Sequence, residues 1–268
     1  MAAPLRIRGG VYVLPNLVTS GGLFCGFYSV IATIREDYLL AAIAILVALV
    51  FDALDGRVAR MTKTSSHFGV EYDSLSDLVA FGVAPGVLAY RWALEPWGPW
   101  GWLAASLYVI CGALRLARFN VQVEVVDKHS FVGLPIPAAA AVVATTILMY
   151  YFLGGEGATN KHITLLLLIY ILAALMISTI PYYSFKELHL RQREPFWLLF
   201  LGIIVMSLAI AEPQIMLFSI FSLYALSGPV RALERLWRKA PSRDTTLELR
   251  EAPRQSLRPL DSKEESSL

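Results

Sequence analysis

Charged residues are scarce in this chain. Only 16% of its 268 residues are Asp, Glu, Lys or Arg, whereas 56% are hydrophobic and the mean hydropathy is +0.57. Soluble domains carry about 25% charged residues, so this composition excludes an ordinary soluble protein. An integral membrane protein is the class that it indicates.

Cysteine and histidine are scarce as well. Cys25 and Cys111 are the only cysteines, and both fall within long apolar stretches, where a free thiol behaves as a small apolar side chain. They support neither a disulfide framework nor a thiolate zinc site. His67 stands alone and is predicted to be a loop residue.

Long apolar stretches are what the chain has in abundance. A helix needs roughly 20 apolar residues to cross about 30 Å of hydrocarbon, and by this measure we expect an all-α, polytopic transmembrane bundle of about eight spans. They are expected at residues 14–34, 38–59, 70–93, 98–118, 134–153, 162–182, 196–212 and 213–231. The first stretch is too long for a signal peptide and runs directly into further spans, so we expect it to be retained.

The domain organisation follows from where the polar residues lie. No polar stretch is long enough for a second folded domain, so we expect one transmembrane bundle over 14–239, preceded by a cytoplasmic segment over 1–13. From 240 to 268 the sequence is mixed in charge and poor in aromatic residues, which predicts a disordered cytoplasmic tail. A cytoplasmic loop is expected at 120–130.

Basic residues lie mainly on one side of the expected spans. They precede the first span and follow the second, fourth, sixth and eighth, which leaves Arg35, Arg91 and Lys161 for the opposite side. The positive-inside rule therefore places both termini in the cytoplasm. The net charge is only +2, and we expect no nucleic-acid partner.

Four aspartates interrupt the apolar stretches. Asp52 and Asp55 end the second span with i, i+3 spacing, and Asp73 and Asp77 open the third with i, i+4 spacing, so each pair shares one helical face. Each charge in a span costs roughly 2.5 kcal/mol or more on insertion. Because the connecting loop is short, the two faces can meet near the cytoplasmic surface, where the carboxylates would repel one another unless cations intervene.

Divalent cations would explain this pattern. Carboxylate oxygens suit Mg²⁺, Mn²⁺ or Ca²⁺ rather than zinc, and two ions would neutralise the four carboxylates. Small residues accompany the acids and would let a ligand approach closely, and Arg57 and Arg60 add positive charge suited to phosphate. The constellation indicates a phosphorylated lipid or nucleotide. Any one aspartate alone could equally be a solvated helix-end residue or an ion-coupling group.

A family signature covers these residues. The sequence from 52 to 77 resembles that of the CDP-alcohol phosphotransferases, with eight fixed positions at fixed spacing: Asp52-x₂-Asp55-Gly56-x₂-Ala59-Arg60-x₈-Gly69-x₃-Asp73-x₃-Asp77. The resemblance implies a polytopic membrane enzyme that transfers a phosphatidyl or related group from a CDP-linked donor to an alcohol and releases CMP. Family members often form homodimers, and we expect one here.

The resemblance also implies roles for single residues. Asp52, Asp55 and Asp73 would bind the metal ions, and Asp77 would complete the site and act as the general base. The remaining signature positions would serve the donor, with the cytidine pocket shaped by three small residues and the phosphates contacted by one arginine: Gly56, Ala59, Gly69 and Arg60.

Further segments resemble the branch of this family that uses serine as its acceptor. They lie at 14–19, 24–26, 113–120, 131–139 and 178–186, and they imply CDP-diacylglycerol as donor and L-serine as acceptor. Arg115 and Arg118, with Asn120 as a polar partner, are candidates for binding the serine carboxylate. Arginines beside a membrane more often determine topology or contact lipid head groups.

Two alternatives remain open at this point. The same core could serve another acceptor, such as glycerol 3-phosphate or inositol phosphate, although no additional cluster of basic residues supports this. An ion-coupled transporter would also use membrane acids, but it predicts acids near the bilayer midplane and internal repeats. Here the acids sit at helix ends, and no inverted repeat is visible.

Overall fold

The computed structural model of the protein describes residues 13–62, 67–125, 131–159, 161–182, 200, 203, 207 and 211–239. The chain divides into two compact units, residues 1–230 and 231–268. Of the second unit, only the helical stretch 231–239 is described. The expected cytoplasmic segment up to residue 12, most of the expected span at 196–212 and the expected tail at 240–268 lie outside the described residues.

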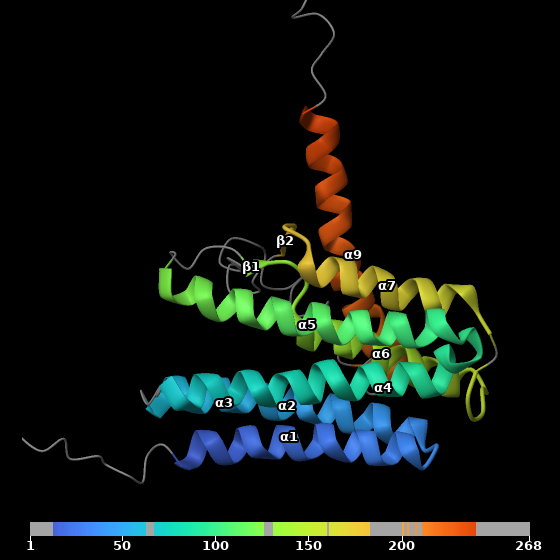
Figure 1. Ribbon diagram of the computed structural model, residues 1–268, viewed down its shortest axis with the longest axis horizontal. Helices are drawn as coiled ribbons and strands as arrows, with labels where there is room; N and C mark the ends of the chain where they lie inside the picture. Colours follow the sequence, from blue (N-terminus) through green and yellow to red (C-terminus); the bar gives the residue numbers. More distant parts are fainter. Residues whose placement is uncertain are drawn as a thin grey trace, which may run out of the picture. The chain divides into compact units, whose positions relative to one another are not determined.

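The described part of the chain is almost entirely helical (Figure 1). Its helices are α1 (Val13–Ile34), α2 (Tyr38–Thr62), α3 (His67–Asp77), η1 (Leu78–Val83), α4 (Ala84–Ala89), η2 (Tyr90–Leu94), η3 (Glu95–Trp97), α5 (Pro99–Val125), α6 (Ile136–Phe152), α7 (Ile163–Ile177) and α9 (Pro213–Lys239). Two strands of two residues each, β1 (Phe131–Val132) and β2 (Pro181–Tyr182), pair antiparallel. They are the one departure from the expected all-α class within the described ranges.

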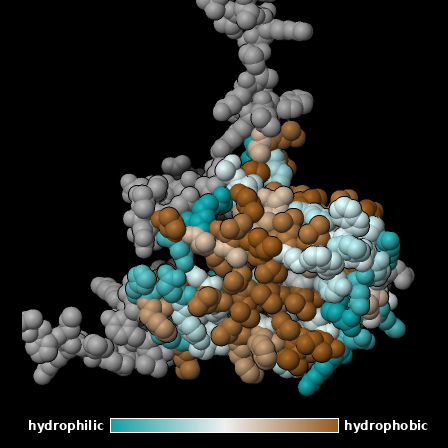
Figure 2. All heavy atoms as spheres, in the orientation of Figure 1, coloured by the Kyte–Doolittle hydropathy of each residue, from teal (hydrophilic) through white to brown (hydrophobic). Residues whose placement is uncertain are grey.

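Four of these helices are long and apolar enough to cross a membrane. The candidate spans are Pro15–Ile34, Tyr38–Val58, Pro99–Val121 and Pro213–Glu234, and α6 and α7 are shorter apolar helices. Large apolar side chains on the spans remain exposed, among them Phe24 at 70% and Leu114 at 55%. Figure 2 shows apolar residues gathered across the middle of this face, with hydrophilic residues toward the two ends of the helices. Such a surface suits lipid rather than water.

Helix α6 forms the centre of the first unit. It packs against α2, η1, α4, α5 and α7, and the run of small residues 138–144 is buried. Alanine side chains let the surrounding helices approach closely. In a membrane, where lipid is as apolar as the side chains, this close van der Waals packing is what holds helices together. Pro135 and Pro137 open this helix, a position that suits proline because the first N–H groups of a helix have no partner.

The segment 67–94 is helical throughout but is not a regular α-helix. It widens into π-helical turns over η1, directly after Asp77, and again over η2. Pro85 lies between these turns and cannot donate a backbone hydrogen bond, which deprives the carbonyl four residues earlier of its usual partner. That carbonyl belongs to Phe81, and it accepts a hydrogen bond of 3.1 Å from the buried Tyr108 hydroxyl of α5. The irregular helix is therefore tied to its neighbour where proline weakens it.

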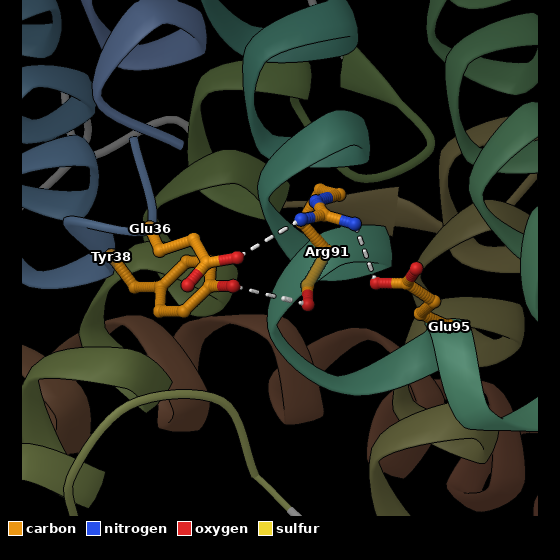
Figure 3. A network of polar contacts seen from close by, with 4 residues as sticks. All are labelled: Glu36, Tyr38, Arg91 and Glu95. Carbon is orange, nitrogen blue, oxygen red and sulfur yellow. Dashed lines mark hydrogen bonds and ion pairs between the residues drawn. The ribbon is translucent and has the colours of Figure 1, made fainter. Parts of the chain in front are cut away.

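Arg91, in η2 of the segment 67–94, contacts the connection between α1 and α2 (Figure 3). The guanidinium contacts Glu36 at 3.3 Å and Glu95 at 2.7 Å. The Tyr38 hydroxyl lies 3.5 Å from the backbone carbonyl of Arg91, to which it donates. These polar contacts lie at the end of the bundle where α1 ends and α2 begins.

One expected boundary is wrong. The fourth span is expected to end at 118 and a loop to occupy 120–130. Helix α5 instead continues to Val125. Arginine is a good helix former, so charge at the membrane surface ends a span without ending the helix. Residues 126–130 of the expected loop lie outside the described part of the chain.

Candidate active site

Three of the four aspartates come together where α2 and α3 meet. Asp52 and Asp55 lie in the last turns of α2, and Asp73 lies in α3. One carboxylate oxygen from each lies within 4.8 Å of the other two. Asp55 is buried, whereas Asp52 and Asp73 are partly buried. The i, i+3 pair and the third carboxylate thus face one another as the spacing predicts.

The cluster has the chemistry of a divalent-cation site. One oxygen of Asp73, Oδ1, is buried and has no hydrogen-bond partner. Within the described ranges, the recorded ion pairs involve none of the clustered carboxylates. Crowded carboxylates without basic partners repel one another, and an oxygen cluster of this kind suits a hard cation. His67, expected in a loop, is the exposed first residue of α3, and it is not part of the cluster.

Asp77 stands beside this group rather than within it. It is the last residue of α3, one helical turn beyond Asp73, and its oxygens are not among the three that lie mutually within 4.8 Å. It is nevertheless within electrostatic range of all three clustered carboxylates and of Arg115 in α5. Asp77 therefore interacts electrostatically with both the acidic cluster and a cationic side chain.

Of the small residues of the signature, Gly56 borders open space. A Cβ atom added at Gly56 would meet no atom within 4 Å, so the space next to Asp55 is open. Gly69 lies in the first turn of α3. Ala59 and Arg60 belong to the last turns of α2, but their side chains lie outside the described residues.

The three residues expected at the acceptor have different surroundings. Arg115 is buried, and its Nε has no hydrogen-bond partner. Arg118 donates to the backbone carbonyls of Ile177 at 3.1 Å and Ser178 at 3.4 Å, at the C-terminal end of α7. Asn120 donates to the Ser74 hydroxyl of α3 at 3.0 Å. The Arg115 guanidinium lies within electrostatic range of Asp77.

Hydrogen bonds from α1 also reach the site, and the spacing of the acids does not reveal them. Thr19 contacts Asp55 at 2.9 Å, and the Ser76 hydroxyl donates to the Thr19 carbonyl at 3.1 Å. The hydroxyls of Ser20 and Tyr72 lie 2.8 Å apart. The available signal is the presence of two adjacent hydroxyl residues, Thr19 and Ser20, in a mainly apolar span.

Comparison with known proteins gives consistent matches. The family model for CDP-alcohol phosphatidyltransferase matches residues 12–180. The chain is 40% identical over 224 residues to a CDP-diacylglycerol–serine O-phosphatidyltransferase of Helicobacter pylori strain ATCC 700392 / 26695, which covers 83% of this chain and 92% of the relative. A Bacillus subtilis strain 168 protein of the same name is 38% identical over 126 residues, covering 47% of this chain and 70% of the relative.

A yeast relative extends the comparison beyond bacteria. The Saccharomyces cerevisiae protein of that name is 40% identical over 138 residues, which is 46% of this chain and 49% of the relative. The family model spans the whole acidic cluster together with Arg115. With four helices able to cross a membrane, this chain is an integral membrane protein and belongs to the CDP-alcohol phosphatidyltransferase family.

Proposed function

We propose that this protein transfers the phosphatidyl group of CDP-diacylglycerol to the hydroxyl of L-serine and releases CMP. The observation that carries this proposal is the carboxylate cluster of Asp52, Asp55 and Asp73, which forms within the family signature. The acceptor is supported by relatives named for serine transfer, one of which aligns over most of both chains. Phosphatidylserine would be the lipid product.

The metal site would consist of the clustered carboxylates, with Asp77 completing it. The orphaned oxygen of Asp73 supports this assignment, and the all-oxygen donor set favours Mg²⁺ or Mn²⁺, with Ca²⁺ compatible with the same ligands. Two ions are expected for four carboxylates. When bound, they would supply charge neutralisation on the pyrophosphate and stabilise the CMP leaving group.

Asp77 would act as the general base. It would accept the proton of the serine hydroxyl as the serine oxygen forms a bond to the lipid-linked phosphorus and the bond from that phosphorus to the CMP oxygen breaks. Arg115 would bind the serine carboxylate, because its guanidinium lies near Asp77 and its Nε has no protein partner. A ligand carboxylate would supply the missing hydrogen bond.

Arg118 and Asn120 would support the acceptor pocket from the same helix. Their hydrogen bonds tie α5 to the end of α7 and to α3, so they would keep Arg115 at a fixed distance from Asp77. On the donor side, Gly56 and Gly69, with Ala59, would leave space for the cytidine, and Arg60 would contact the phosphates. The open volume over Gly56 supports the first of these assignments.

The topology is proposed from the distribution of charge. Basic residues near the ends of the spans support a cytoplasmic location for the carboxylate cluster and both termini, where serine and CMP would be soluble. We retain about eight spans in a single bundle over 14–239 with a cytoplasmic tail over 240–268. The four long helices, α6, α7 and the segment 67–94 would account for seven of them, and the expected span at 196–212 would be the eighth. A homodimer is the proposed assembly.

The direct test is CMP release by the purified protein. CDP-diacylglycerol is supplied with Mn²⁺ or Mg²⁺, and L-serine is compared with glycerol 3-phosphate and inositol phosphate. We expect release with serine only, and its loss in Asp77→Asn. Release with another acceptor instead would retain the reaction class and reject serine. No release with any acceptor or metal would reject the enzyme and favour an ion-coupled transporter.

A further inference from the structure

Thr19 contacts both helices that carry the aspartates, although α1 itself contains none of them. Its side-chain oxygen lies 2.9 Å from Oδ2 of Asp55 in α2. Its backbone carbonyl accepts a hydrogen bond of 3.1 Å from the hydroxyl of Ser76 in α3. All three residues are buried. A single residue of α1 therefore joins the two halves of the carboxylate cluster.

The Thr19 hydroxyl has two acceptors within reach but only one proton to donate. One is the carbonyl of Pro15 at 3.1 Å, four residues earlier in the same helix. Threonine within a helix makes this contact by default. The other is the Asp55 carboxylate, which is closer and charged, and a hydrogen bond to an ionised acceptor is roughly twice as strong as one between neutral groups. The proton therefore goes to Asp55.

This hydrogen bond, together with one from the backbone N–H of Gly56, fixes the orientation of the Asp55 carboxylate. The terminal torsion of aspartate is broad, so an unsupported carboxylate rotates readily. With Oδ2 held by Thr19, the carboxylate would be kept in one orientation toward a cation shared with Asp52 and Asp73. Hydrogen bonds of this kind to a metal ligand typically change metal affinity by roughly 10–100-fold.

The contact through Ser76 extends the same control to α3. Ser76 lies between Asp73 and Asp77 in sequence, so its bond to the Thr19 carbonyl holds the helical turn that carries both acids. Because Thr19 contacts both α2 and α3, this one residue of α1 helps to hold the two helices at a fixed spacing at the cluster.

We propose that Thr19 is a positioning residue of the metal site, which orients Asp55 through its hydroxyl and holds α3 through its carbonyl, and so sets the affinity for the divalent cation. This inference rests on the proposed function, because the cation belongs to that proposal.

The test measures Mn²⁺ binding directly, on purified protein in detergent without donor or acceptor. Thr19→Val keeps the shape of the side chain and removes the hydroxyl, and we expect the Kd for Mn²⁺ to rise by roughly 10–100-fold. Thr19→Ser keeps the hydroxyl and is expected to bind nearly as the wild type does. Thr33→Val is the matched control, since Thr33 is a buried residue of the same helix whose hydroxyl donates to the Ser29 carbonyl at 2.8 Å, away from the aspartates.

Activity measured against Mn²⁺ concentration gives a second readout. The Thr19→Val enzyme should need more Mn²⁺ and recover its kcat at saturating Mn²⁺, which a general packing defect would not allow. If this variant does not fold, Thr19→Ala replaces it. Mn²⁺ binding equal to the wild type in both hydroxyl-free variants, or a kcat loss that Mn²⁺ does not restore, would overturn the inference.

A parallel variant separates this inference from the proposed function. Asp55→Asn removes a proposed ligand and must itself weaken Mn²⁺ binding. If Asp55→Asn binds Mn²⁺ normally, the proposed metal site fails. If Asp55→Asn binds weakly and Thr19→Val binds normally, the metal site stands and the positioning role of Thr19 fails.

Discussion

The acidic residues at the two ends of the bundle differ in whether they have a cationic partner. At one end, Glu36 and Glu95 share the guanidinium of Arg91, and the Tyr38 hydroxyl donates to the same residue's backbone. These acids are partly exposed and each has a cationic partner. Exposed ion pairs of this kind contribute about 0–1 kcal/mol to stability, and their role is to fasten the connection between helices.

At the other end, Asp52, Asp55 and Asp73 crowd together, and the ion pairs recorded within the described ranges do not include them. Such an arrangement lowers the stability of the metal-free protein, because like charges at short distance repel. A bundle that needed only to be stable would pair these acids or replace them. The difference between the ends is what we expect if the paired acids serve structure and the clustered acids serve the proposed metal site.

The largest effect is expected from Asp77→Asn. Removing a general base typically lowers the rate by roughly 10²–10⁴-fold, whereas Glu95→Gln at the opposite end should leave CMP release unchanged. The midpoint of thermal unfolding of the metal-free protein should not fall in Asp77→Asn, because one of the mutually repelling carboxylates has been removed. Comparable losses of activity in the two variants would remove the distinction between the ends.

Removing divalent cations with a chelator should affect only the end of the bundle that carries the aspartate cluster. EDTA is expected to abolish CMP release, and Mn²⁺ is expected to restore it. Binding should also stabilise the folded protein, by about 2.7 kcal/mol when Mn²⁺ is present at 100 times its Kd. Thermal unfolding with and without Mn²⁺ measures this. The stabilisation should be lost in Asp55→Asn and retained in Glu36→Gln, and its persistence in the aspartate variant would place the cation elsewhere.

Gly56→Val should weaken donor binding without destabilising the fold. The added side chain enters space that is open in the protein, and one misplaced methyl group in a binding pocket changes recognition by roughly 10-fold or more. We expect KM for CDP-diacylglycerol to rise accordingly. Ala53→Val, on an exposed face of the same helix, is the matched control. An unchanged KM would mean that the nucleotide does not approach Gly56.

Arg91→Met should give the smallest effect, a small loss of stability with activity unchanged. Losing both partly exposed ion pairs is expected to lower the free energy of unfolding by about 1 kcal/mol, with CMP release at 25 °C unchanged. Glu95→Gln, which removes one contact, should cost less. Chemical denaturation in detergent measures the difference. A loss of activity in Arg91→Met with stability intact would show that the two ends are coupled.

Local sequence information predicted the elements that depend on few residues. The apolar runs predicted the first helix to within one residue and the start of the second, which continues three residues beyond the predicted end. The spacing of Asp52, Asp55 and Asp73 predicted that their side chains would converge. These features follow from helical periodicity and from a short connecting loop. Asp77 was expected in the same ligand set, and its exact relation to the cations remains a prediction.

The features that could not be predicted depend on distant partners. The contact between Thr19 and Asp55 joins residues 36 positions apart, and the Tyr108 hydroxyl compensates for a proline in another helix. No local pattern encodes either pairing. Arg118 presents the same difficulty, because whether it faces a ligand or the carbonyls at the end of α7 depends on where α7 lies.

The π-helical turn at η1 has a consequence for how the protein tolerates insertions and deletions. A π turn holds one residue more than an α turn, and this one begins immediately after Asp77. Deleting one residue from 78–83 would restore regular helix but would rotate everything before it by about 100° relative to the buried face that follows. Point substitutions along η1 should be tolerated better than a change in its length. The extra residue sets how far the face of α3 that carries the acids is rotated about the helix axis relative to the buried apolar face that follows.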